Sequence, residues 1–236
     1  YDQCVSCGMC LVSCPFSAIV DKSQIFQTVL ALKSDTPVYA AIAPSFVKQF
    51  GDNVTPEQVR AALKAVGFED MVEVAIGADL CAVQEAVDFL NEVPAHHSWL
   101  GTSCCPAWSV MAKKTYPEYA EHISMTLTPM VLTGRMTKKQ HPDCKVVFIG
   151  PCAAKKLEAS RTSVRSDIDF VLTFEEMAGI FDAKNIDFNK LEIEEPIKTS
   201  SSLGKGFASS GGVAAAVVNA IHCVEPDMEV KTVKAE

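Results

Sequence analysis

Short apolar runs alternate with helix signals along most of the chain, and this alternation limits the possible folds more than any other feature. Strands are predicted at residues 38–42, 71–76 and 145–150, with a short one near Trp99. Helical patterns cover residues 80–90, 106–114, 174–181 and 212–222, and another helix begins at about residue 153. Strands that alternate with helices predict an α/β fold with mainly parallel sheets flanked by helices.

One helix start is well marked. Thr55 is a good N-cap, Pro56 suits the first turn, and Gln58 completes a capping box. A shorter helix is predicted from Ser23 to Lys33, before a polar linker. In parallel sheets, sites gather at the carboxyl ends of the strands, so the segments that follow the strands are the first places to search for chemistry.

The composition excludes some classes of protein. The 236 residues are 48% hydrophobic and carry a net charge of −8, which argues against a nucleic-acid binder. No apolar run reaches the length of a membrane span, and no secretory signal is visible. The chain begins with Tyr1 directly before a cysteine motif, so we expect a fragment cut at its N-terminus.

Four of the ten cysteines lie in one short, regular run. Cys4, Cys7, Cys10 and Cys14, with a proline after the last, have the spacing of a bacterial ferredoxin motif for a [4Fe–4S] cluster. The first three would bind one cluster, and the fourth usually reaches a second cluster, whose own run we expect upstream. A zinc site and a disulfide knot are the alternatives. So many metal-binding thiolates indicate a reducing compartment.

Two further cysteine motifs stand where an apolar segment meets a helix. The first is Cys104-Cys105-Pro106 and the second is Pro151-Cys152, and they are called the first and second elbow below. A helix N-terminus favours thiolate over thiol. Lys155 lies one turn beyond Cys152, so its ammonium can reach an anion beside that cysteine. The alternative is inert, packed cysteines, which we accept for the three others, Cys81, Cys144 and Cys223.

The elbows carry a resemblance to a known family. The runs 102–108 (TSCCPAW) and 151–158 (PCAAKKLE) resemble the first two signature motifs of [FeFe]-hydrogenases. The likeness extends through Ala43-Pro44-Ser45, Gly77-Ala78-Asp79 and Gly211-Gly212-Val213. It implies an α/β catalytic domain of the iron hydrogenase large-subunit type, preceded by a small ferredoxin-like Fe–S segment.

The resemblance also implies a cofactor. Cys105 and Cys152 would be two of four thiolates around a [4Fe–4S] cluster, which is bridged to a diiron unit with CO and cyanide to form the H-cluster. Cys104 would carry protons to and from the diiron unit. Lys155 would donate to one cyanide, while Ser45 and the adjacent residues would line the other; those adjacent residues are Ala43 and Pro44.

The family's proton path would continue outward through Glu85 and Ser124. Asp88 lies one turn beyond Glu85, so the two carboxylates share a helix face. An ordinary solvated face is the alternative, but a buried relay needs titratable groups within hydrogen-bond reach, as these would be.

Three features depart from the family's pattern. Gly150 stands where well-studied members have Met, and Met130 stands where a polar amide is common. Both changes alter the shell of the diiron unit. The third signature, which supplies the remaining two cysteines, is absent, and Cys223 is a poor substitute. We therefore expect a truncated domain that cannot hold a complete H-cluster and is itself inactive.

Three parts are predicted: the C-terminal part of a ferredoxin-type domain (1–22), a linker helix (23–37) and a truncated hydrogenase catalytic domain (38–236). The predicted function is reversible H₂ oxidation in the cytoplasm, in anaerobic metabolism, with ferredoxin or another redox partner and with hydrogenase maturation proteins. The alternatives are a sensory homologue with slow turnover, a hydrogenase-like Fe–S assembly protein without a diiron unit, and a ferredoxin fused to an unrelated domain.

Overall fold

A parallel sheet of four strands forms the centre of the molecule. The computed structural model describes residues 3–193 and 200–233. The strands are β1 Val38–Ile42, β2 Asp70–Glu73, β3 Lys145–Gly150 and β4 Phe170–Thr173. Their order is β2-β1-β3-β4, and all three pairings are parallel. The predicted α/β class with a parallel sheet is therefore confirmed.

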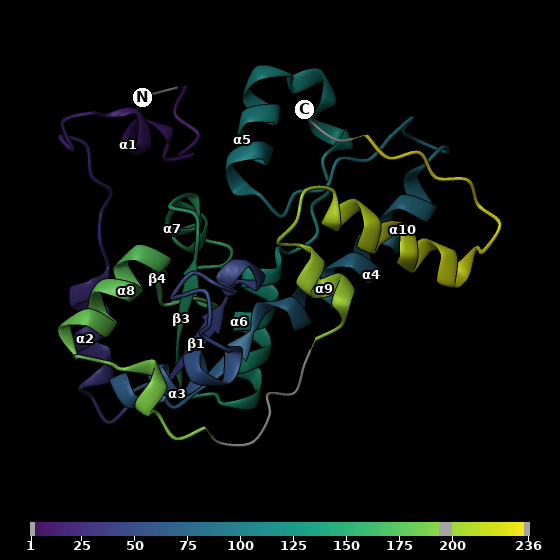
Figure 1. Cartoon of the computed structure of the whole chain (residues 1–236). Helices are drawn as coiled ribbons and strands as arrows, with labels where there is room; N and C mark the ends of the chain where they lie inside the picture. The colour runs from purple at the N-terminus through teal and green to yellow at the C-terminus, as the bar shows by residue number, and fades with distance from the viewer. Residues whose placement is uncertain (1–2, 194–199, 234–236) are drawn as a thin grey trace.

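Helices cover both faces of this sheet, and Figure 1 shows α2 and α8 on one side and α6 on the other. Because both faces are covered, the inner strands carry continuous apolar runs, and Ala40, Ala41 and Ile42 of β1 are fully buried. The helices in chain order are α1 Met9–Ser13, α2 Ile25–Leu32, α3 Pro56–Val66, α4 Val74–Glu92, α5 Pro106–Thr115, α6 Pro129–Gln140, α7 Ala154–Ala159, α8 Phe174–Ala183, α9 Ser202–Gly206 and α10 Gly212–Val224.

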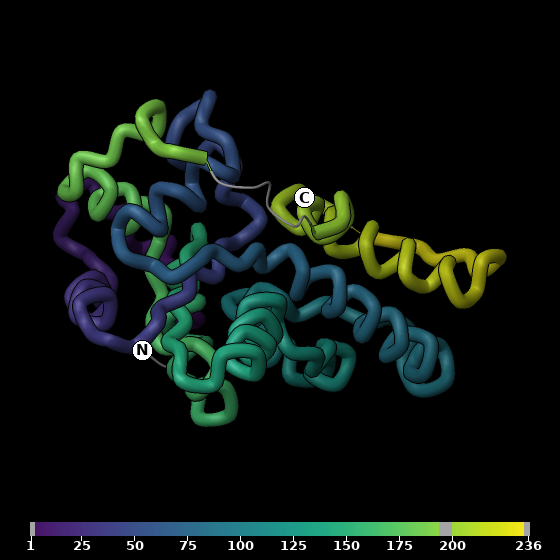
Figure 2. The backbone as a smooth tube through the Cα atoms, turned by 90° about the horizontal axis from the view of Figure 1, so that it is seen from below, coloured from purple at the N-terminus to yellow at the C-terminus, as the bar shows by residue number. Residues whose placement is uncertain are grey.

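A second, smaller core lies away from the sheet. It joins α4 to α10 through Ala82, Ala86, Ala216, Val217 and Ile221. Figure 2 shows α4 and α10 extending together from the sheet region to one end of the molecule. Among the described residues, no helix combines the length and apolar character that crossing a membrane requires.

The local sequence signals for helices predicted several helix positions correctly. Thr55 caps α3, with Gln58 N–H donating to its hydroxyl and the Gln58 side chain accepting from Thr55 N–H. The predicted helices at 23–33, 106–114, 174–181 and 212–222 correspond to α2, α5, α8 and α10. Short polar signals fix these ends because they act within one turn.

Other predictions were wrong in their boundaries. The run 71–76 is not one strand: β2 ends at Glu73, and α4 begins at Val74. Apart from Glu73 this run is apolar, and a short apolar run is compatible with a buried strand and with a buried helix. Here tertiary packing selects the helix for its second half. The short strand near Trp99 is only an isolated bridge between Gly101 and Ile123. Strand β4 and helix α6 were not predicted.

Gly77 explains how closely α4 approaches α6. A Cβ atom at this position would lie 2.3 Å from Thr133 Oγ1 and 2.7 Å from the carbonyl oxygen of Pro129. Both partners belong to α6, and one of them is backbone, so they have little room to move. The contact places the start of α4, and hence the buried face that follows it, against α6.

Gly77→Ala should therefore lower the free energy of unfolding by about 1–3 kcal/mol, the usual cost of overpacking. The measurement is urea denaturation of the two proteins. Gly179→Ala is the matched control, since Gly179 is also helical but has nothing within 4 Å of the added methyl. It should raise stability by up to about 1 kcal/mol. Equal effects of the two substitutions would contradict the account.

Candidate metal centre

The first elbow forms the start of α5. Cys105 is the N-cap residue, Pro106 opens the helix, and the N–H of Trp108 donates to Cys105 Sγ over 3.5 Å. The Cys105 thiol is exposed. Our expectation that a strand leads into this elbow was wrong, because only the isolated bridge at Gly101 precedes it. The thiol nevertheless lies at a helix N-terminus, where an N–H group stabilises a thiolate.

The second elbow follows β3 directly, as predicted. Cys152 is partly exposed and stands two residues before α7. Gly150, the last residue of β3, has no room for a side chain: a Cβ atom would lie 2.5 Å from the Phe148 ring and 3.2 Å from Ala43 Cβ. Phe148 thus fills the space beside the second elbow, so packing explains why residue 150 is a glycine in this chain.

Lys155 connects the two elbows. Its side chain extends from α7, and its ammonium donates to the carbonyl oxygen of Cys104 over 2.9 Å and to Glu158 Oε2 over 2.7 Å. Lysine has three donors, so one N–H remains for another acceptor. The sequence placed Lys155 beside Cys152 only, and the structure adds its bond to the first elbow.

Glu158 neutralises this ammonium inside the protein. The Glu158 side chain is 3% exposed and that of Lys155 is 12% exposed. Thr128 Oγ1 donates to Glu158 Oε1 over 2.7 Å, so both carboxylate oxygens have a partner. Sequence reasoning quoted Glu158 only as part of a motif and missed Thr128. The lysine–glutamate spacing along α7 was the available signal for the pair.

The other cysteine of the first elbow lies in a different environment. Burial raises the pKa of the Cys104 thiol to about 11; the Lys155 ammonium lowers this pKa, and Glu85 adds to the raise. The thiol of Cys104 is therefore protonated at neutral pH, whereas Cys105 is open to solvent at its helix cap. The two neighbouring residues differ as a proton carrier and a metal ligand would.

Glu85 is a buried residue of α4 near Cys104. It is 1% exposed and accepts a hydrogen bond from the N–H of Ser103 at 3.5 Å through Oε1. Burial raises the pKa of its carboxyl to about 7, against the opposing effect of hydrogen bonds from Ser103 and Ser124. Among the described residues Oε2 has no hydrogen-bond partner, which is unusual for a buried oxygen.

A row of polar groups leads from Glu85 towards the surface. Ser124 is buried beside Glu85, and its Oγ accepts from the N–H of Thr126 over 3.2 Å. Thr126 Oγ1 donates to Asp88 Oδ2 over 2.7 Å. Asp88 is partly exposed on α4. The structure therefore brings Glu85, Ser124 and Asp88 together, and it adds Thr126, which sequence reasoning missed.

The residues after β1 line a different hollow. Pro44 and Ser45 border a cavity of about 450 Å³ at the carboxyl end of the sheet, together with Glu73 and Lys205. This cavity does not include the elbow cysteines, so Ser45 is not brought onto Cys152 here. Ala43 does reach the second elbow, through its closeness to Gly150. Met130 is 1% exposed within the main core.

The N-terminal cysteine run lies beside the second elbow and the C-terminal end of α5. Lys114 Nζ on α5 donates to the carbonyl oxygen of Cys4 over 2.9 Å. A Cβ on Gly8 would lie 3.8 Å from Ala153 Cβ, next to Cys152. In Figure 1 the α1 segment lies near α7 and α5, away from the sheet. An electron carrier held by this run would be close to the second elbow.

The chemistry of the donor set fits iron–sulfur ligation. Cys4, Cys7, Cys10 and Cys14 are free and solvent-accessible. Backbone N–H groups, that of Phe16 foremost, lower the pKa of Cys14 and favour its thiolate. Within residues 3–193 and 200–233, no three His, Cys, Asp or Glu side chains are grouped around a point that one metal ion could occupy. The thiols are thus available but are not gathered as ligands of a single ion.

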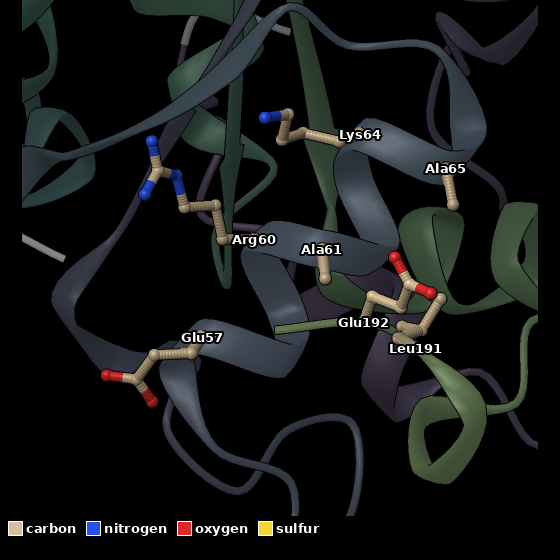
Figure 3. Close-up of a pocket in the computed structure, with 7 residues that line it drawn as sticks. All are labelled: Glu57, Arg60, Ala61, Lys64, Ala65, Leu191 and Glu192. Carbon is tan, nitrogen blue, oxygen red and sulfur yellow. The ribbon is translucent and has the colours of Figure 1, made fainter. Parts of the chain in front are cut away.

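The remaining cysteines lie elsewhere. Cys81 and Cys144 are buried, as expected, whereas Cys223 is exposed on α10, so our expectation of a packed thiol was wrong for Cys223. A cavity of about 180 Å³ between α3 and the chain after Lys190 is also separate from the elbows (Figure 3). Its lining includes Arg60 and Glu192 but none of the predicted site residues.

Comparison with known proteins decides the family. Residues 36–236 match the family described as “Iron only hydrogenase large subunit, C-terminal domain”. The chain belongs to this family. The resemblance inferred from the two elbows is thus confirmed, and iron–sulfur cofactors are expected for such a protein.

Individual relatives agree with this assignment. The chain is 30% identical over 245 residues to iron hydrogenase 1 of Clostridium pasteurianum, covering 93% of this chain and 42% of that one. It is 28% identical to the NADP-reducing hydrogenase subunit HndD of Solidesulfovibrio fructosivorans, covering 93% and 43%. The cytosolic Fe-S cluster assembly factor NAR1 of Kluyveromyces lactis is 29% identical over 62% of this chain and 33% of its own length.

Solved structures show the same fold. A variant of [FeFe]-hydrogenase HydA1 from Chlamydomonas reinhardtii aligns with a TM-score of 0.69 and 26% identity, over 85% of this chain and 58% of that one. A [FeFe]-hydrogenase studied for oxygen inactivation of the H cluster 2Fe subcluster aligns with a TM-score of 0.71 and 25% identity, over the same shares. The chain spans less than half the length of the two curated hydrogenases named above.

The raised pKa of Glu85 makes the stability of this hydrogenase-family chain depend on pH. The Glu85 carboxyl has a pKa of about 7 in the folded state and an ordinary value of about 4.3 in the unfolded state. The protonated carboxyl therefore stabilises the folded state, and this contribution is fully present below pH 4. That contribution is lost as pH rises through 7. The free energy of unfolding of the natural protein, relative to Glu85→Gln, should fall by up to about 3 kcal/mol between pH 4 and pH 8. Denaturant titrations at each pH measure it, and a difference independent of pH would contradict the raised pKa.

Proposed function

We propose that this chain is part of a [FeFe]-hydrogenase that catalyses the reversible reaction 2H⁺ + 2e⁻ ⇌ H₂. The observation that carries the proposal is the division of roles at the first elbow. Cys105 offers an exposed thiol at a helix cap, while Cys104 keeps a protonated thiol beside a buried carboxyl. A binding site for a cluster alone would need the first thiol and would have no use for the second.

Cys105 and Cys152 would hold the cubane part of the H-cluster, and the third donor of Lys155 would bind a cyanide. When bound, the H-cluster supplies the redox-active iron at which H₂ is formed or split. Lys155 also fixes the distance between the elbows, because it extends from α7 and binds the carbonyl of Cys104. Pro44 and Ser45 would line the other cyanide, although here they border the neighbouring cavity at the carboxyl end of β1.

The chain's own residues move the proton. Asp88 exchanges protons with solvent and accepts from Thr126 Oγ1, while Ser124 lies beside Glu85. The Thr126 group that bonds Ser124 Oγ is its amide N–H, which does not relay protons, so a water would carry the proton between the two hydroxyls. Glu85 holds and releases a proton near neutral pH, which is the condition for efficient relay. Cys104 then carries the proton at the end nearest the elbow. Each transfer breaks one bond to hydrogen and forms another, so no charge accumulates in the buried row.

Electrons would reach the elbows through a cluster on Cys4, Cys7 and Cys10, with Cys14 serving a neighbouring cluster. The closeness of Gly8 to Ala153 supports this order, since electron transfer needs short separations. A ferredoxin or another redox protein would supply the electrons, and hydrogenase maturation proteins would supply the diiron unit. We propose the cytoplasm as the compartment, on the number of free cysteines.

Two other functions have support within the family. The likeness to NAR1 supports an Fe–S assembly factor without a diiron unit. The doublet at Cys104 and Cys105 favours the hydrogenase, because an assembly factor has no use for a proton-carrying thiol. A sensory hydrogenase with slow turnover has support from Gly150 and Met130, which change the surroundings of the diiron unit.

Cys104→Ala should abolish H₂ turnover in the natural, matured protein while leaving its iron content unchanged, because it removes the proton carrier and keeps the ligands. The measurements are H₂ production with a chemical reductant and iron analysis. Cys144→Ala is the matched control, since Cys144 is also a buried thiol but lies before β3, at the opposite end of that strand from Cys152. Full turnover in Cys104→Ala would refute the relay, and no turnover in the natural protein would favour the assembly class.

A further inference from the structure

A cavity of about 150 Å³ opens beside the proton relay, and we call it the side chamber. Its inner wall includes the buried residues Ser103, Ser124 and Thr128, together with the carboxylate of Glu158. Two of these residues, Ser103 and Ser124, also hydrogen-bond Glu85. The side chamber therefore borders the buried carboxylate of Glu158 directly, and it approaches Glu85 only through its lining residues Ser103 and Ser124. The proposed relay uses Glu85 and not Glu158.

The mouth of the side chamber is basic. Lys113 on α5 and Arg161 after α7 line it, and the exposed Ser163 lies between the inner wall and solvent. The Lys113 ammonium donates to Met125 Sδ over 3.0 Å, a weak acceptor. A metal cation would be repelled by the two positive charges at this mouth.

Three hydroxyl groups that line the side chamber already use their proton. Thr128 Oγ1 donates to Glu158, Thr126 Oγ1 donates to Asp88, and Ser109 Oγ donates to the carbonyl of Pro106 over 3.2 Å. A hydroxyl has one proton, so each of these groups offers only lone pairs to the side chamber. Glu158 also has lone pairs left after accepting one bond on each oxygen. Beside Glu158 an anion would meet a carboxylate and used hydroxyl groups, so it is disfavoured at the inner wall.

Water satisfies these requirements, because it is neutral and brings two donors. The volume is sufficient for several molecules, and a polar cavity with this many partners holds ordered water. Water that bonds to Thr128 and Ser124 at the same time would join the surroundings of Glu158 to the relay.

We propose that the side chamber holds a chain of ordered water that conducts protons from the mouth at Arg161 and Ser163 to Ser124 and Glu85, as a second route parallel to the one through Asp88. The proposal rests on the proposed function for its purpose. Each hop breaks one O–H bond in a donor water and forms one in its neighbour, so the water chain keeps its composition and needs no oxidant or reductant. Glu158 and Thr128 position the water and are not catalytic residues.

The first test is structural and needs no iron. A high-resolution crystal structure of the iron-free, full-length protein should show waters bonded to Thr128 and Ser124. Ser163→Trp should close the mouth and empty or disorder the chamber. Ser166→Trp is the matched control, since Ser166 is an exposed serine of the same turn and does not line the cavity. A dry chamber in the natural protein would overturn the proposal, and so would a bound anion.

The second test follows proton delivery itself. After the iron-free protein is mixed with D₂O at pH 6, the Glu85 carboxyl band in the infrared shifts as its proton exchanges; Glu85→Gln assigns the band. In an Asp88→Asn background, adding Ser163→Trp should slow this exchange at least tenfold, and adding Ser166→Trp should not. Equal rates would overturn the second route. Because neither test measures H₂, a protein that conducts protons this way and lacks turnover would refute the proposed function alone.

Discussion

The ammonium of Lys155 is the contact on which the site depends. It joins an α7 side chain to the Cys104 carbonyl and is balanced by Glu158 inside the protein. Burying such a pair costs several kcal/mol per ion unless good hydrogen bonds compensate. Here Thr128 and the Cys104 carbonyl supply them. Removing Lys155 or Glu158 would leave the other charge buried without its partner. While the pair is intact, the bond from Lys155 to the Cys104 carbonyl holds both elbows in one arrangement.

Much of the fold follows from local signals. The cap at Thr55 and the strands β1 and β3 depend on patterns that are only a few residues long, and the sequence predicts all three correctly. The end of β2 was misjudged because an apolar run has no local mark that separates strand from helix. Helix α6 was missed although Pro129 marks its first turn. Its neighbours, α4 and the sheet, select it through packing that the sequence does not display.

The candidate site, like the fold, is only partly predictable from the sequence. Motif spacing predicted the elbows, the family resemblance predicted Glu85 and Ser124, and helical spacing predicted Asp88. None of them identified Thr126 or Thr128, since a hydroxyl in a loop looks the same whether it faces solvent or a carboxylate. The structure also adds what spacing cannot give: the burial of Glu85, the packing of Phe148 against Gly150, and the side chamber beside Glu158.

The central claim is that the two elbows serve a diiron hydrogenase centre and not a plain cluster. Infrared spectroscopy of the natural protein after maturation tests this most directly, because metal-bound CO and cyanide absorb where protein groups do not. The account predicts bands from both ligands, and it predicts that Lys155→Met shifts or removes the cyanide bands. A protein that carries its full iron–sulfur content yet shows no such bands would contradict the account.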